Sequence, residues 1–215
     1  MTISSSIRST SLAMLCVAAL GVAHPAQAGV HGVRAWGGGR QLGHAGATFR
    51  NGQGGITHAR GTRASGPNGS AAHSAYTSVN PDGGVKHQAA TKVNGVKGGS
   101  LTSNNSYTRN PDGSAQGSFN RSARGASGGS YDSSGSYARD ASGNWSAERQ
   151  TSASGARGSY SGSTSGSNGT ATHDSTIHGA NGGTYNGQTS YTRGQGVTHT
   201  GSCTDAGGAA TTCAH

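Results

Sequence analysis

The sequence predicts an all-β protein of tandem β-hairpins, with a unit of about 30 residues made of two strands of about ten residues each. Three observations lead to this fold class. Glycine-ended turns recur regularly, the segments between them alternate along a strand, and a Tyr-x-Arg pattern returns at fixed offsets. An antiparallel meander is favoured over a parallel β-solenoid, because the turns are of the type that joins antiparallel strands.

The turns fall into two classes. The first ends in glycine after turn-forming residues, as in Asn-Pro-Asp-Gly at residues 80–83 and 110–113. Pro sets φ for a type I turn, Asp suits the third position, and Gly accepts the left-handed conformation that follows. This is the chemistry of a three-residue hairpin loop with a bulge. The second class fills the longer gaps, for example at residues 124–129. Together the turns predict about eleven strands.

One strand face carries the same residue types in several units. A Tyr is followed two residues later by an Arg in three units, and a spacing of two keeps both side chains on one face. The candidate surface-binding face consists of Tyr107, Arg109, Tyr137, Arg139, Trp145, Tyr191 and Arg193. With residues 111–113 as the loop, Tyr107 lies opposite Gly117. In the next hairpin Arg139 lies opposite Trp145, where we expect a cation–π pair.

The other face of the same strands is wholly polar. The half-apolar Tyr/Arg face therefore needs a cover, which the sheet folding over itself, another copy or an external surface would supply.

The chain divides into four segments. Residues 1–28 read as a secretory signal peptide, with an apolar run after Arg8 and a small-residue cleavage pattern at its end. Residues 29–50 form a glycine-rich N-terminal segment, 51–200 the hairpin repeat and 201–215 a C-terminal tail. Removing the signal leaves no transmembrane segment. We expect a secreted protein, in the periplasm, at the cell surface or outside the cell, with a disulfide between Cys203 and Cys213.

Composition limits the class of protein. Glycine accounts for 40 of 215 residues and only 30% of residues are hydrophobic, which by itself is typical of disordered chains. The chain without residues 1–28 has 15 Lys and Arg against seven Asp and Glu, a net charge of +8. These cations are scattered, so no basic tail is predicted.

Histidine recurs regularly, most clearly at His31, His44, His58, His73 and His87. A ladder of this kind could bind Zn²⁺, Cu²⁺ or Ni²⁺. In an antiparallel meander, however, like ends of strands recur only at every second strand, about 9.6 Å apart, which is too far for one shared ion. We therefore interpret the histidines as tolerated at a repeat position, and expect no metal or other cofactor.

No arrangement of residues indicates catalysis, so we expect a protein that is not an enzyme. Three of the seven acids, Asp82, Asp112 and Asp140, lie in turns with a local structural role. The serines occur in low-complexity sequence and not at a strand-to-helix elbow.

The sequence thus favours an exported structural or adhesive repeat protein that associates with itself. The alternative is a polyanion-binding protein for nucleic acid, lipopolysaccharide or acidic glycan, because Arg occurs among aromatic residues. The second alternative is metal capture by histidine. In composition the chain is similar to bacterial surface fibres and adhesive matrix proteins, a similarity that assigns no residue a role.

Overall fold

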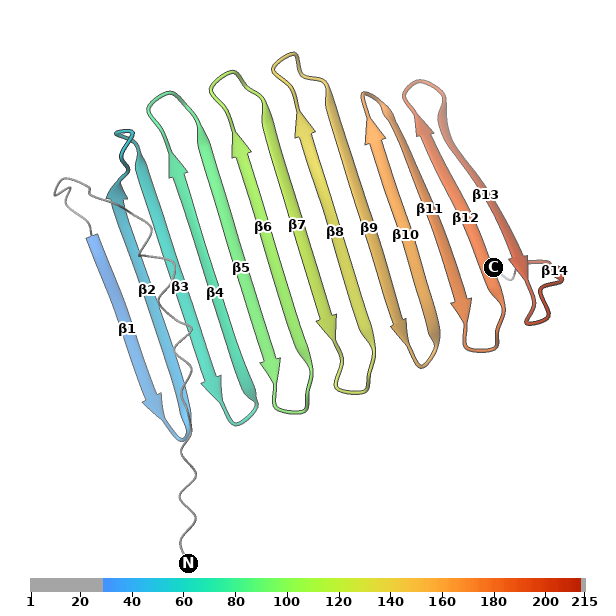
Figure 1. The fold of residues 1–215 in the computed structure, drawn as a ribbon, viewed down its shortest axis with the longest axis horizontal. Coiled ribbons are helices and arrows are strands. Elements are labelled where there is room, and N and C mark those ends of the chain that lie inside the picture. The colour runs from blue at the N-terminus through green and yellow to red at the C-terminus, as the bar shows by residue number, and fades with distance from the viewer. Residues whose placement is uncertain (1–28, 214–215) are drawn as a thin grey trace, which may run out of the picture.

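The computed structural model describes residues 29–213 as one open antiparallel sheet (Figure 1). The expected signal peptide, residues 1–28, lies outside the described residues. The strands are β1 (Gly29–Gly37), β2 (Arg40–Arg50), β3 (Ile56–Gly66), β4 (Gly69–Val79), β5 (Val85–Gly95), β6 (Ser100–Arg109), β7 (Ala115–Arg124), β8 (Ser130–Arg139), β9 (Trp145–Gly155), β10 (Gly158–Ser167), β11 (Thr170–Gly179), β12 (Thr184–Thr192), β13 (Gly196–Thr204) and β14 (Ala210–Thr211).

The strand order in the sheet is the order in the chain, and every neighbouring pair is antiparallel. Each strand contacts only the strands before and after it in sequence. The antiparallel hairpin meander is therefore confirmed, and the parallel solenoid is excluded. Because the sheet does not fold back over itself, it forms a single layer with two open faces (Figure 1).

The predicted turn chemistry is present in detail. At residues 110–113 the N–H of Gly113 donates to the carbonyl of Asn110 at 3.1 Å, and the N–H of Asn110 donates to the carbonyl of Ser114 at 2.8 Å. Gly113 has φ +84°, the left-handed conformation that the bulge requires. The Asp112 carboxylate accepts the backbone N–H of Ser114 at 2.9 Å, which holds the loop closed.

The predicted register is confirmed residue by residue in the two central hairpins. Tyr107 pairs with Gly117, and Arg139 pairs with Trp145. Since paired residues project to the same side, the register divides the strands into two faces. We call the side that carries Tyr107 the tyrosine face. It consists of the odd-numbered residues of β1, β4–β9 and β11–β13 and the even-numbered residues of β2, β3 and β10. The opposite side is the serine face.

The sheet has more strands than the eleven that the turns predict. Residues 29–50, expected to be a glycine-rich segment, form β1 and β2 and begin the sheet. Their turn is a two-residue loop of Gly38 and Gly39, with φ of +57° and +72°, which is the geometry of a type I′ hairpin. The short strand β14 is the third addition, at the C-terminal end.

The described sheet has almost no core. Its buried residues other than glycine are Ala75, Ala115, Thr57 and Ser133. No large side chain in the described strands is fully buried, and Trp36 is 76% exposed. Stability must therefore come from the backbone ladders and from cross-strand side-chain pairs, which contribute about 0.2–1 kcal/mol each.

The predicted disulfide is present. Cys203 and Cys213 are bonded, with their Cα atoms 5.3 Å apart. The bond holds β14 against the end of β13, where only two residue pairs connect the strands. Across residues 29–213 we find no helix with the length and apolar character needed to cross a membrane.

Candidate functional site

Charge is segregated between the two faces. Within the described strands, the tyrosine face carries seven arginines and no acidic residue. These arginines are Arg40, Arg50, Arg60, Arg109, Arg121, Arg139 and Arg149. The serine face carries the cations Arg34, Arg63, Lys86, Lys92 and Arg124 and the acids Asp132, Glu148 and Asp174. The tyrosine face therefore holds a formal charge of +7 and the serine face +2.

Aromatic residues follow the same division. Of the 11 Phe, Trp and Tyr residues, eight lie on the tyrosine face. They are Tyr107, Phe119, Tyr131, Tyr137, Trp145, Tyr160, Tyr185 and Tyr191. Five of them fall on the four central strands β6–β9, together with Arg109, Arg121, Arg139 and Arg149. We call these nine residues the central cluster.

The candidate residues chosen from the sequence are only partly brought together. Tyr107, Arg109, Tyr137, Arg139 and Trp145 lie on the tyrosine face of β6, β8 and β9. Tyr191 shares the face but belongs to β12, three strands beyond β9. Arg193 lies in the turn after β12, and its side chain packs beside the backbone of Gly169.

The expected cation–π pair of Arg139 with Trp145 is not formed, although the two residues are cross-strand partners. Arg139 instead turns back towards its own loop at Gly143. Within the described strands the cation–π contact is that of Arg121, whose guanidinium carbon lies 5.6 Å from the centre of the Phe119 ring. An arginine has long rotamers, so cross-strand pairing alone does not determine which ring it covers.

The candidate face chosen from the sequence leaves out Phe119, Arg121, Tyr131 and Arg149, which belong to the same face. A usable signal was present, because Gly117 is the partner of Tyr107 and residues two and four positions further along share its face. Following that alternation through β7 would have added Phe119 and Arg121 to the candidate face.

Aromatic rings on the tyrosine face lie over positions that lack side chains. A Cβ atom added at Gly135 would lie 2.6 Å from the Phe119 ring, and one added at Gly166 would lie 3.3 Å from Trp145. The rings therefore cover strand glycines, an arrangement that the sequence predicted for Tyr107 over Gly117. A ring that rests on the backbone turns its other side outward.

The central cluster borders a shallow apolar hollow of about 590 Å³ on the tyrosine face. Its walls come from Tyr107, Phe119, Tyr137 and Trp145, and its floor is largely glycine and alanine from β7–β11. A hollow of this volume is in the range of small-molecule sites, but it is open and built on strands rather than enclosed.

Arg149 is the best-anchored cation of the cluster. Its Nε donates to the Ser133 hydroxyl at 3.3 Å and to the Thr151 hydroxyl at 3.2 Å, and its Nη2 donates to the Tyr131 hydroxyl at 3.5 Å. A hydrogen bond from Ser133, followed by the hydrogen bond and charge of Arg149, lowers the pKa of Tyr131 from its usual value. These contacts pre-orient one guanidinium on the open face.

The histidines also lie mainly on the tyrosine face. Of the eight in the described strands, seven share it, and the eighth, His178, is on the serine face. Most pair with a threonine across the strands, as His73 Nδ1 does with the Thr91 hydroxyl at 2.9 Å. His31 instead lies beside His44, with ring centres 5.9 Å apart and the rings tilted by 41°. In the described residues no group of three or more His, Cys, Asp and Glu could hold a metal ion.

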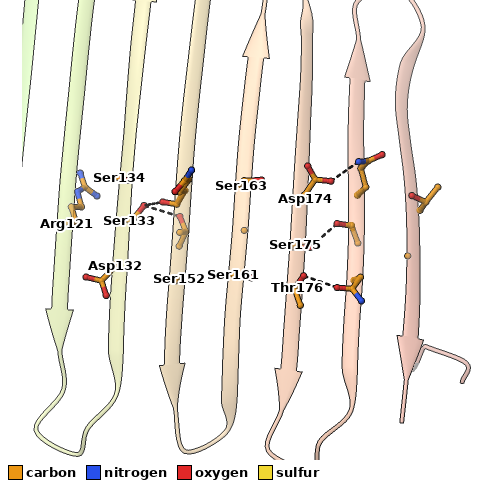
Figure 2. A pocket seen from close by; sticks show the side chains of 18 of the residues that line it. Arg121, Asp132, Ser133, Ser134, Ser152, Ser161, Ser163, Asp174, Ser175 and Thr176 are labelled. Atoms are coloured by element: carbon orange, nitrogen blue, oxygen red, sulfur yellow. Dashed lines mark hydrogen bonds between the residues drawn. The ribbon is translucent and has the colours of Figure 1, made fainter. Parts of the chain in front are cut away.

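The serine face carries a second hollow, of about 890 Å³, over β7–β13 (Figure 2). Most of its lining residues carry hydroxyls, amides or, at Asp132 and Asp174, carboxylates, and many of these already bond to each other. Gln188 donates to Asp174 at 2.7 Å, and Thr176 donates to Asn186 at 2.8 Å. Asp132 forms an exposed ion pair with Arg124 at 2.7 Å, and this hydrogen bond lowers its pKa. The cross-strand pairs thus satisfy much of this surface internally.

Comparison with known proteins gives no relative. No family model, no curated protein and no solved structure matches the chain.

Proposed function

We propose that the protein is an exported, non-catalytic adhesive repeat protein that binds polyanions through its tyrosine face. The segregation of charge carries this proposal. A face with seven arginines and no acid attracts phosphate, sulfate and carboxylate groups, and like charges on one flat surface act together on a polymer.

The shape of the sheet supports a large partner rather than a small one. Thirteen long strands at about 4.8 Å per strand and ten residues at about 3.3 Å give a face of roughly 60 by 33 Å. That area is on the order of 2,000 Å², which exceeds the surface that one partner buries in a standard interface. The near absence of a core and the exposed hydrophobic side chains fit a protein whose sheet faces contact a binding partner.

Features of the sequence support export. The signal-like residues 1–28 precede the sheet, and the bond between Cys203 and Cys213 is of the kind that persists in oxidising compartments.

Two variants with the same loss of charge test the proposal. The first carries Arg109→Gln, Arg121→Gln and Arg139→Gln on the tyrosine face. The second carries Arg63→Gln, Lys86→Gln and Lys92→Gln on the serine face. Affinity for heparin and for a 20-nucleotide thymidine strand is measured between 50 and 200 mM salt, with circular dichroism as the check on folding.

We expect the tyrosine-face variant to lose roughly tenfold or more in affinity and to show a salt slope smaller by about 2, since each phosphate contact contributes about 0.7. The serine-face variant keeps most of the affinity and the slope. Equal losses in both variants would show that net charge alone attracts the polymer. Binding that does not change with salt would refute the proposal.

A second candidate function is self-association, favoured by the free edge of the sheet. All nine residues of β1 are exposed, the strand pairs with β2 alone among the described strands, and its one charged residue is Arg34. Unprotected edges of this length pair with other strands. We expect light scattering to show dimers that the Val33→Lys variant abolishes. A protein that stays monomeric at all concentrations would rule this candidate out.

A further inference from the structure

From the central cluster we infer that the polyanion is single-stranded nucleic acid, and that the hollow on the tyrosine face receives its bases. The inference rests on the proposed function, and adds to it the chemical class of the partner. It starts from the coincidence of two features on β6–β9, exposed arginines and partly exposed aromatic rings with a shallow apolar space between them.

Aromatic rings and arginines occur in alternation over the central cluster. Tyr107 and Tyr137 belong to β6 and β8, so the strand with Gly117 separates them by about 9.6 Å. Both rings are partly exposed, at 39% and 37%. Arg109 and Arg139 lie two residues beyond them on the same face. A backbone that runs across the strands can therefore meet guanidinium groups while its bases meet rings.

Aromatic rings of the central cluster rest on strand positions that lack side chains. Trp145 rests over Gly166 and Phe119 over Gly135, and the Arg121 guanidinium carbon lies 5.6 Å from the centre of the Phe119 ring. Rings seated on the backbone can serve as a stacking platform, because Tyr107 and Tyr137 remain 39% and 37% exposed and the Arg121 guanidinium beside Phe119 is itself a planar group on which bases stack. Bases of any sequence can stack on such a platform, since every base has a π face.

The apolar floor distinguishes bases from sugars. Glycine and alanine line it, at Gly117, Gly135, Ala147, Gly166 and Ala171. The hydroxyls of a glycan's sugar ring find no hydrogen-bond partner on this floor, so contact with it offers them nothing beyond what water already provides. A nucleobase can place an apolar face there and keep its polar edge in water. The chemistry of the hollow therefore favours nucleic acid over glycan.

Two probes of equal charge separate stacking from charge. The first is a 20-nucleotide thymidine strand, and the second is a deoxyribose-phosphate strand of the same length without bases. Fluorescence anisotropy gives their affinities for the purified protein, with heparin as the glycan probe. We expect the thymidine strand to bind at least about tenfold more tightly than the strand without bases.

The variant Trp145→Leu should reduce this preference by roughly tenfold, and Tyr137→Leu should act in the same direction. Tyr76→Leu, an aromatic residue of the serine face, is the matched control and should leave the preference unchanged. A merely structural role of Trp145 would weaken both probes alike and leave their ratio intact.

The outcomes are distinct. If neither strand nor heparin binds, the proposed function fails. If both strands bind equally, polyanion binding stands and base stacking is wrong. If heparin binds more tightly than the thymidine strand, an acidic glycan is the partner and the inference is overturned.

Discussion

Two glycine-to-alanine substitutions should change stability in opposite directions. Alanine in a strand is normally better than glycine by about 0.5–1 kcal/mol, because glycine loses more conformational freedom on folding. At Gly43 the added Cβ meets nothing within 4 Å. At Gly135 it would lie 2.6 Å from the Glu148 carbonyl oxygen and 2.6 Å from the Phe119 ring. We therefore expect Gly43→Ala to stabilise the sheet and Gly135→Ala to destabilise it.

The carbonyl of Glu148 belongs to the backbone of β9 and cannot move without disturbing the ladder. Overpacking of this kind costs about 1–3 kcal/mol, so the two variants should differ by about 1–3 kcal/mol in the free energy of unfolding. Urea titration followed by far-ultraviolet circular dichroism measures the difference, and the slope with denaturant checks that unfolding remains comparable. Equal stabilisation by both alanines would refute the seating of Phe119 over Gly135.

Two further predictions concern the end of the sheet and one turn. Replacing Cys203 and Cys213 by serine should speed amide hydrogen exchange in β14 and the end of β13, while β6–β9 stay protected, because each strand is held only by its neighbours. The side-chain hydrogen bond from Asn144 lowers the pKa of Asp140 below its ordinary value of 3.8. Because the folded pKa is depressed, the contribution of this turn is present above about pH 4 and is lost as the pH falls through the folded pKa. The Asn144 amide shift in NMR should therefore titrate with a midpoint below 3.8, and a midpoint above it would contradict the contact.

Local chemistry explains why the turns and the register could be predicted. The Asn-Pro-Asp-Gly loops close through contacts within five residues, such as the Asp112 carboxylate with the Ser114 N–H. Once a loop is placed, antiparallel pairing follows by counting, and the pairs Tyr107–Gly117 and Arg139–Trp145 result. The hairpin of β1 and β2 was not predicted because its loop lacks the Pro and Asp of the other turns, although a Gly-Gly pair is itself a type I′ hairpin signal.

Side-chain geometry could not be predicted in the same way. Arg139 reaches its own turn rather than Trp145, and Arg121 covers Phe119. Both contacts form within one strand and its own turn, so they depend on side-chain rotamers that cross-strand pairing does not determine. The segregation of charge could be predicted in part. It is encoded by residue parity, but it becomes visible only when the alternation is carried through all thirteen long strands.

Because contacts are confined to neighbouring strands, the width of this sheet can change by whole hairpins. Because each strand touches only the strands beside it, a hairpin added or deleted changes the width of the face by about 9.6 Å without repacking the rest. Loops of two and of three residues occur in the same sheet, at Asn168–Gly169 between β10 and β11 and at residues 111–113 between β6 and β7, and paired residues still share a face across both. Length changes in the loops are therefore neutral for the face, whereas one residue inserted within a strand would send every later side chain of that strand to the opposite side. If the tyrosine face binds a long polymer as proposed, its avidity changes by whole hairpins, with each new unit repeating the spacing of the last.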